Sequence, residues 1–256
     1  MQARIAGAAR GARWLGEGWQ LFRAGPLGWL ALVFAYWLIM TIVSLVPYAG
    51  IAAASIMVPA FSVGFMAAAR AAERGGRVEL TLLFEGFRHA PKAQLALGVA
   101  YLACLGLVLG ATTLVDDGAL ARWMLVGRRP EDEVLQSGAF FAALVAAVLL
   151  YAPVMMLFWF APPLAAWHSC PPAKALFFSL VACLLNWRAF LAYGAVTALV
   201  TLVLPFVALS TLLLASGGAL RAPLMSLVFP LLVLLLPTLF ASFYVSYRDV
   251  FGAPRA

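Results

Sequence analysis

Apolar residues run along this chain in long uncharged stretches, which shorter charged segments separate. A helix needs roughly 20 apolar residues to cross a hydrocarbon core of about 30 Å, and six stretches are of about this length. They run from Leu27 to Ala49, Ile51 to Ala69, Ala93 to Val115, Gly138 to Trp167, Ala189 to Ser216, and Pro223 to Tyr247. All six lack Asp, Glu, Lys, Arg and His. The pattern predicts an all-α bundle with six transmembrane spans.

A short segment precedes each odd-numbered span; the first two have one apolar and one polar face, and the third is mostly apolar and too short to cross. In the first segment, residues 8–23, the apolar face centres on Trp14 and Gly18, and charged residues recur at helical spacing on another face. The second segment covers residues 80–92, and the third covers residues 173–186. Helices of this kind lie in the membrane interface, with aromatic rings at the level of the headgroups. We therefore expect three interfacial helices.

The even-numbered spans share a proline that stands eleven residues before a basic residue. The pairs are Pro59 and Arg70, Pro163 and Lys174, and Pro237 and Arg248. Together with the preceding segments, this spacing predicts three repeats, each an interfacial helix followed by a transmembrane hairpin. Proline removes a helical hydrogen bond, so we expect kinks or cavity-lining positions. The candidates are Pro59, Pro153, Pro163, Pro205 and Pro237.

The basic residues are sorted by loop. If the amino terminus is cytoplasmic, the inner segments hold 13 of the 17 basic residues. Lys and Arg are retained on the cytoplasmic side of short loops, so both termini are predicted to be cytoplasmic. The outer loop, residues 116–137, is then periplasmic. There Pro130 precedes three acidic residues, which predicts a helix that projects from the membrane and continues into the fourth span.

Composition agrees with a membrane protein. Apolar residues make up 65% of the chain and charged residues only 11%, so an ordinary water-facing surface cannot be built from it. We expect one integral domain over residues 1–256, in the inner membrane of a bacterium. The formal net charge of +7 does not indicate nucleic acid, because the basic residues are distributed among loops rather than gathered on one folded surface.

The sequence contains no grouping typical of a cofactor site or an enzyme. His89, His168, Cys170 and Cys183 lack the spacing of a zinc module, so we expect no metal or other cofactor. The charged residues lie in loops without a recognisable catalytic arrangement, and catalysis is not expected. Acidic residues such as Glu73 are interleaved with arginines, as in a solvated loop at the lipid surface.

Basic and small residues offer two further sets of candidates. Gly106 and Gly110 form a GxxxG pair, which predicts close helix packing within the bundle, with homodimerisation as the alternative. The basic residues near the predicted cytoplasmic interface are candidate contacts for anionic lipid headgroups. These are Arg13, Arg23, Arg70, Arg74, Arg88, Lys92, Lys174, Arg188 and Arg248.

Several stretches resemble a family of uncharacterised bacterial six-span inner-membrane proteins. The resemblance rests on GWQLFRAGPLGWL, VPAFSVGFMAAARAAERG, LLFEGFR, FWFAPPLAAWH and PPAKALFFSLVACLLNWRAFLAYG, and it covers nearly the whole chain. It implies fold and location only. The repeated interfacial helix and hairpin also look like the membrane domain of some glycerophosphodiester phosphodiesterases, although the catalytic domain of those enzymes is absent.

These observations favour a non-enzymatic membrane protein that organises partners or lipids through basic interfacial helices. The partners would be anionic headgroups on the cytoplasmic side, a membrane protein or a second copy of the chain. Because the spans carry no charge, ion-coupled transport is disfavoured. The alternative is a transporter or channel for a small neutral or lipid-like solute, which the prolines in the even-numbered spans would permit.

Overall fold

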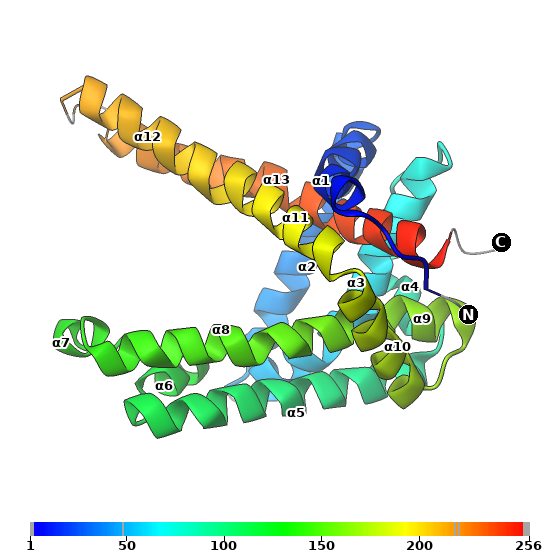
Figure 1. Cartoon of the computed structure of the whole chain (residues 1–256), viewed down its shortest axis with the longest axis horizontal. Coiled ribbons are helices and arrows are strands. Elements are labelled where there is room, and N and C mark those ends of the chain that lie inside the picture. Colours follow the sequence, from blue (N-terminus) through cyan, green and yellow to red (C-terminus); the bar gives the residue numbers. More distant parts are fainter. Residues whose placement is uncertain (1–2, 48, 218, 220, 253–256) are drawn as a thin grey trace. The chain divides into compact units, whose positions relative to one another are not determined.

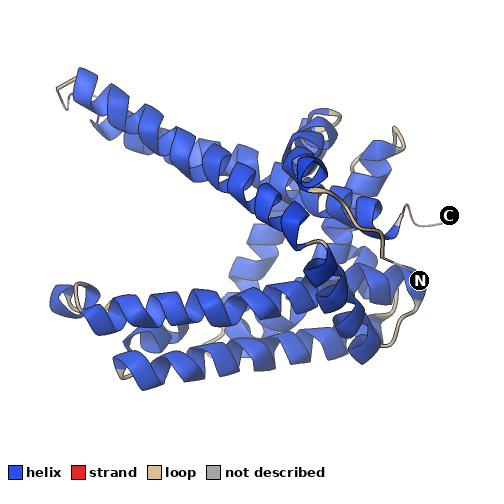
Figure 2. Cartoon of the chain, viewed as in Figure 1, coloured by secondary structure: helices blue, strands red, loops and turns tan. Residues whose placement is uncertain are grey.

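A computed structural model describes residues 3–47, 49–217, 219 and 221–252, without the side chains of 221–225, 227–229 and 231–232. The described part is helical and contains no strand (Figure 2). The first half, coloured blue to green in Figure 1, contains α1 (Ala8–Arg23), α2 (Pro26–Ser44), α3 (Ala49–Glu73), the 3₁₀ helix η1 (Leu80–Phe84), α4 (Glu85–Arg88), α5 (Pro91–Asp116) and α6 (Ala119–Val126). The second half contains α7 (Asp132–Leu135), α8 (Gly138–Trp159), α9 (Ala161–His168), α10 (Pro172–Leu185), α11 (Trp187–Ala198), the π-helix η2 (Leu199–Val203), α12 (Leu204–Ala215) and α13 (Arg221–Phe251).

Five stretches of the described residues are long and apolar enough to cross a membrane. They are Pro26–Ser44, Ala49–Glu73, Pro91–Asp116, Gly138–His168 and Trp187–Ala215. Each covers most of one of the first five predicted spans. The sixth predicted span, residues 223–247, lies within the 31-residue helix α13, but part of it lies outside the described side chains. The all-helical fold is therefore confirmed for the described part of the chain, which has five stretches that could span a membrane by length and composition.

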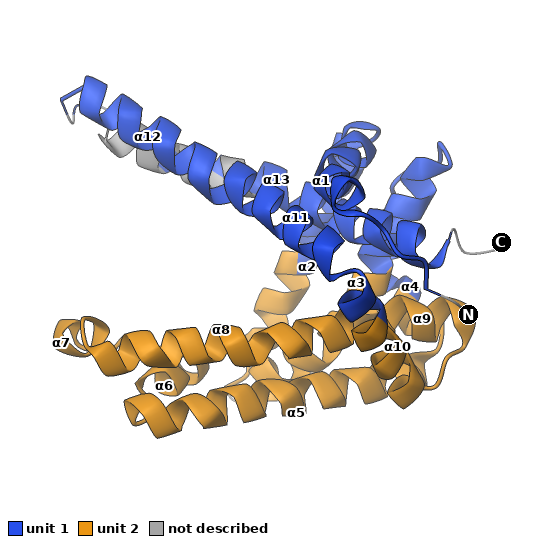
Figure 3. Cartoon of the chain, viewed as in Figure 1, with its two compact units in different colours: residues 1–36, 64–85, 182–256 blue, residues 37–63, 86–181 orange. Residues whose placement is uncertain are grey.

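The chain divides into two compact units, each assembled from separate segments (Figure 3). Unit 1 consists of residues 1–36, 64–85 and 182–256, and unit 2 consists of residues 37–63 and 86–181. In unit 1, α1 packs against α11 and α13, which come from the far end of the sequence. In unit 2, α5 packs along α8.

The break between α8 and α9 in unit 2 has an identifiable cause. Pro162 and Pro163 cannot donate to the helical ladder, and α8 ends at Trp159 just before them. At this break the Ser179 hydroxyl of α10 bridges the Phe160 amide and the Met156 carbonyl, because it donates to the Met156 carbonyl at 2.7 Å and accepts from the Phe160 amide at 2.9 Å. The predicted kink in the fourth span is thus present, and a buried side chain satisfies the freed backbone groups.

The loop between α5 and α8 differs from the prediction. The acidic residues after Pro130 do start a helix, α7, but it ends at Leu135, and a separate helix α8 begins after Ser137, whose hydroxyl accepts from the Phe140 amide. The expected continuous helix into the fourth span is wrong. Its physical reason is the N-cap at Ser137, which favours a new helix start over continuation.

The proline spacing also needs one correction. Pro59 and Pro237 lie inside α3 and α13, and their partners Arg70 and Arg248 lie in the last turns of those helices. The segment after Pro163 is shorter, because α9 ends at His168. Lys174 therefore belongs to the next helix, α10. The proline and the basic residue eleven positions later lie in one helix in two of the three predicted repeats, not in all three.

Candidate charged site at the end of the last helix

Helix α1 approaches two other helices of unit 1 through its glycines. A Cβ atom added at Gly11 would come within 2.0 Å of the Ala189 carbonyl oxygen in α11. A Cβ at Gly18 would come within 2.6 Å of the Thr238 carbonyl oxygen in α13. Only glycine permits such close backbone contact, so α1 is fixed on α11 and α13 by its sequence.

The apolar face of α1 is covered by protein. Trp14 is fully buried, and its ring lies 5.3 Å from that of Phe190 and 5.8 Å from that of Tyr193, both in α11. The predicted amphipathic helix thus has the expected bounds and apolar stripe. Its Trp14 side, however, packs on other helices of the chain rather than on lipid.

The charged residues of α1 meet those of α13 and α3 in one cluster. Arg10 pairs with Glu17 and with Asp249. Arg248 donates to Glu17 at 2.6 Å and to Asp249 at 3.4 Å, and it also pairs with Glu73 at the end of α3. Two arginines therefore bridge three carboxylates, which gives a net charge of −1. We call these five residues the charged cluster.

Two aromatic residues complete the charged cluster. The Trp14 indole nitrogen donates to Asp249 at 2.8 Å, and the Tyr244 hydroxyl donates to Glu73 at 2.6 Å. Burial alone raises the pKa of the Asp249 carboxyl, but hydrogen bonds from Arg10 and Trp14, with the charges of Arg10 and Arg248, outweigh it and bring this pKa below its ordinary value. Asp249 is therefore ionised near neutral pH, and its side chain is only 13% exposed.

A smaller set of contacts of the same kind occurs between the second interfacial segment and α3. We call these contacts the second Glu-Gly junction, and those of Glu17 and Gly18 with α13 the first. Glu85 lies 3.8 Å from Arg70, the residue eleven positions after Pro59. A Cβ at Gly86 would come within 2.2 Å of the Ala60 carbonyl oxygen, and Ala60 directly follows that proline. In the first junction, Glu17 pairs with Arg248 and Gly18 contacts the residue after Pro237. The same Glu-Gly pair thus meets the same proline-to-arginine spacing twice.

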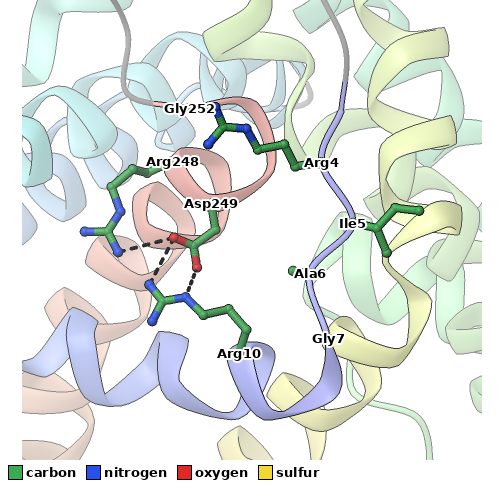
Figure 4. Close-up of a pocket in the computed structure, with 8 residues that line it drawn as sticks. All are labelled: Arg4, Ile5, Ala6, Gly7, Arg10, Arg248, Asp249 and Gly252. Carbon is green, nitrogen blue, oxygen red and sulfur yellow. Dashed lines mark hydrogen bonds and ion pairs between the residues drawn. The ribbon is translucent and has the colours of Figure 1, made fainter.

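A cavity of about 560 Å³ that is largely open at the surface lies beside the charged cluster (Figure 4). It is lined by Arg4, Ile5, Ala6, Gly7, Arg10, Arg248, Asp249 and Gly252. The segment before α1 forms one wall and is held in place by backbone bonds. The Arg4 amide donates to the Val250 carbonyl at 2.8 Å, and the Ala6 amide donates to the buried Asn186 side chain at 2.6 Å.

The nine predicted headgroup contacts divide into two groups. Seven are exposed: Arg13, Arg23, Arg74, Arg88, Lys92, Lys174 and Arg188. Arg70 and Arg248 are partly buried and form the ion pairs described above. The long stems of two exposed residues lie near aromatic rings, with Lys174 5.5 Å from the Phe178 ring and Arg188 5.3 Å from the Trp187 ring. Contact with lipid remains a prediction for all nine.

The glycine pair in the third predicted span has a different environment from the one expected. A Cβ at Gly106 or Gly110 would meet no described atom within 4 Å, so the described part of the chain shows no close helix contact at either glycine. They instead line an apolar groove of about 350 Å³ in unit 2, together with residues such as Leu109 and Met124. The close helix contacts are made by other glycines, including Gly18 and Gly98.

The charged cluster was not predicted from the sequence. Glu73 is exposed, as expected, but it ends α3 rather than lying in a loop, and it accepts from Tyr244 and Arg248. Arg10, Glu17 and Asp249 were not proposed as site residues. One signal was available, namely the Glu-Gly pair that occurs in both the first and second interfacial segments.

Comparisons with known proteins identify one informative relative. The chain is 39% identical over 258 residues to the protein of Burkholderia thailandensis named "Probable inner membrane protein BTH_II0599", and the match covers 98% of this chain and 94% of that protein. No protein-family model and no solved structure match the chain.

Proposed function

This chain belongs to the family of the Burkholderia thailandensis probable inner membrane protein, and from this premise we propose that it binds anionic phospholipid headgroups on the cytoplasmic side and thereby organises lipids or membrane partners. Several of its helices are long and apolar enough to span a membrane, as expected for a multi-pass inner membrane protein. The proposed role is non-enzymatic.

One observation carries the proposal, namely the two-sided use of α1. Its inner face is fixed on α11 and α13 by Gly11, Gly18 and Trp14. Its other side leaves Arg13 and Arg23 exposed, together with neighbouring Trp19, which is 42% exposed. An exposed tryptophan between two arginines is the composition of an interfacial anchor on an anionic membrane, because the ring sits among headgroups and the cations reach the phosphates.

We further propose that the chain has six spans in three repeats, with both termini cytoplasmic. Three contacts, each within one unit, support this arrangement. The second interfacial segment contacts α3 of the first hairpin, α10 contacts α8 of the second, and α1 contacts α13 of the third. Each segment thus packs on the second helix of the preceding hairpin. The repeated Glu-Gly junction is a further argument for common ancestry of the repeats.

The proposal is tested by the lipids that remain bound to the protein. The full chain would be reconstituted in nanodiscs with equal parts phosphatidylglycerol and phosphatidylcholine, and the bound lipids identified by native mass spectrometry. We expect enrichment of phosphatidylglycerol that falls as salt is raised, because the contacts are electrostatic. Enrichment is expected to fall in the double variant Arg13→Gln, Arg23→Gln.

A matched control removes the same charge from the outer loop. Arg128 and Arg129 are both exposed, and the double variant Arg128→Gln, Arg129→Gln is expected to retain the enrichment. Equal lipid composition around the wild type and in the bulk nanodisc would overturn the proposal. So would an equal loss of enrichment in the two double variants.

Transport of a small neutral or lipid-like solute is the second candidate function. It is favoured by hydroxyl groups between α11 and α13, where the Tyr193 and Ser242 oxygens lie 2.7 Å apart and Thr238 is buried next to Pro237. The π-helix η2 and Pro205 follow in the same span, and π-helical turns often occur at functional sites. Solute flux into liposomes that is lost in Ser242→Ala but kept in Ser216→Ala would support transport, and its absence would exclude it.

A further inference from the structure

We propose that the cavity beside the charged cluster binds one phosphate group, either that of a phospholipid headgroup or free inorganic phosphate. The lipid form of this inference rests on the function proposed above and names the ligand of one specific site. The cavity volume of about 560 Å³ falls within the roughly 300–1,000 Å³ that is usual for small-molecule sites.

The side chains that line the cavity favour an anion. Three arginines, Arg4, Arg10 and Arg248, line the cavity with one carboxylate, Asp249. Arg10 and Arg248 are also paired with Glu17 and Glu73, so Arg4 is the lining arginine that lies outside the charged cluster. The other two acids of the charged cluster do not line the cavity. The planar guanidinium group matches the geometry of phosphate oxygens, which is why arginine is common in phosphate sites.

The backbone of α1 adds to this preference. Gly7 lines the cavity and is the N-cap residue of the 16-residue helix α1, which has no side-chain cap and no acidic residue in its first turn. The positive end of a helix dipole with uncapped amides attracts anions. The opposing negative end of α13 lies at Gly252, and the Arg4 side chain extends towards it (Figure 4).

The cavity is also preorganised. The charged cluster orients Arg10 and Arg248, and each guanidinium has five N–H donors. The described contacts use four donor positions in Arg10 and three in Arg248, so donors remain for a ligand. Asn186 fixes the opposite wall, because its amide donates to the Arg4 carbonyl at 3.1 Å and accepts from the Ala6 amide. A ligand would therefore enter a largely formed site.

The experiment measures phosphate binding by two routes on the full-length protein. Equilibrium dialysis of detergent-purified protein against labelled inorganic phosphate tests the free ion. Native mass spectrometry from the mixed nanodiscs described above tests a tightly retained phosphatidylglycerol. The test variant is Arg4→Gln, and the matched control is Arg23→Gln, which removes one exposed arginine at the other end of α1.

We expect Arg4→Gln to weaken binding by about tenfold, because a charge-assisted hydrogen bond to phosphate is lost. Arg23→Gln is expected to stay within about twofold of the wild type. Arg4→Lys keeps the charge but lacks the planar guanidinium, so it is expected to recover only part of the binding. Binding by dialysis identifies the free ion as ligand, whereas retention of phosphatidylglycerol alone identifies a headgroup. Either result supports the site.

The inference is overturned if the wild type binds phosphate by neither route, or if Arg4→Gln and Arg23→Gln lose the same amount. The failure of the proposed function is distinguishable. General enrichment of anionic lipid that persists in Arg4→Gln, without a tightly retained phosphate, would exclude the site and leave the proposed function standing. Phosphate bound in the cavity without any general enrichment of anionic lipid would support the site and exclude the proposed function.

Discussion

The two Glu-Gly junctions differ in the number of side chains that take part in them. At the first, Glu17 pairs with Arg248 inside a cluster of five charges, to which Trp14 and Tyr244 also donate. At the second, Glu85 and Arg70 lie 3.8 Å apart. The first pair is 231 residues apart in sequence, whereas the second is separated by a short loop. The junction with more side chains thus joins the segments that are farther apart in sequence.

The difference indicates what each junction must accomplish. The second interfacial segment is held near α3 by the chain itself, so one ion pair and a close glycine contact suffice. Helix α1 is the first described helix and α13 is the last, and closing a longer loop costs more conformational entropy. The charged cluster and the buried Trp14 offset that cost. We conclude that the first junction fixes the position of α1, and with it the exposed Arg13 and Arg23.

The largest effect is expected from Gly18→Leu. A side chain here would collide with the α13 backbone, so α1 must leave its site, with a loss of stability of about 3 kcal/mol or more. SDS-induced unfolding followed by circular dichroism would measure it. Gly106→Leu is the matched control, because no described atom lies within 4 Å of its Cβ position, and its stability is expected to change by less than about 1 kcal/mol. Equal losses of stability in the two variants would refute a special role of Gly18 in holding α1 on α13.

A smaller loss is expected from Asp249→Asn. The change keeps the shape of the side chain but removes the charge that Arg10 and Arg248 share, which costs about 1–2 kcal/mol in a partly exposed cluster. The same unfolding assay would measure it. Asp132→Asn removes an exposed ion pair with Arg129 and is expected to cost less than about 0.5 kcal/mol. A loss no greater at Asp249 than at Asp132 would contradict the account.

The pH dependence of stability tests the contribution of Asp249 to the first junction. Because the folded protein lowers the pKa of Asp249, this residue stabilises the fold above its unfolded pKa of about 3.9 and ceases to do so as pH falls through the lower folded pKa. Protection of α1 amides from hydrogen exchange should therefore be constant from about pH 7 to 5 and decline only below about pH 4. In Asp249→Asn, protection should be lower throughout, without this part of the decline. An unchanged profile in the variant would contradict the prediction.

Some helices were predictable from sequence because they depend on local patterns, but the second interfacial segment, residues 80–92, forms η1 and α4 and ends in the start of α5 rather than forming one helix. Segment 8–23 was predicted with the bounds that α1 has, and the break near Pro162 followed from proline chemistry. The charged cluster was not predicted, because it depends on which helices meet. Periodicity shows that Glu17 lies on a polar face of α1. It does not show whether that face meets water or, as in the structure, the side chains of Arg248 and Glu73.

The role of Gly106 and Gly110 could not be settled by sequence for a related reason. A GxxxG pair permits close packing but does not specify a partner helix. The structure uses Gly18 and Gly98 for such contacts and leaves the other pair beside a groove. The homodimer alternative for that pair stays a prediction.

The central claim is that Glu17 and Arg248 are coupled more strongly than Glu85 and Arg70. Two double-mutant cycles, with Glu→Gln and Arg→Gln at each junction, measure this coupling directly in the unfolding assay. The account predicts a coupling free energy of about 1–2 kcal/mol at the first junction and under about 0.5 kcal/mol at the second. Equal couplings, or a larger one between Glu85 and Arg70, would contradict it.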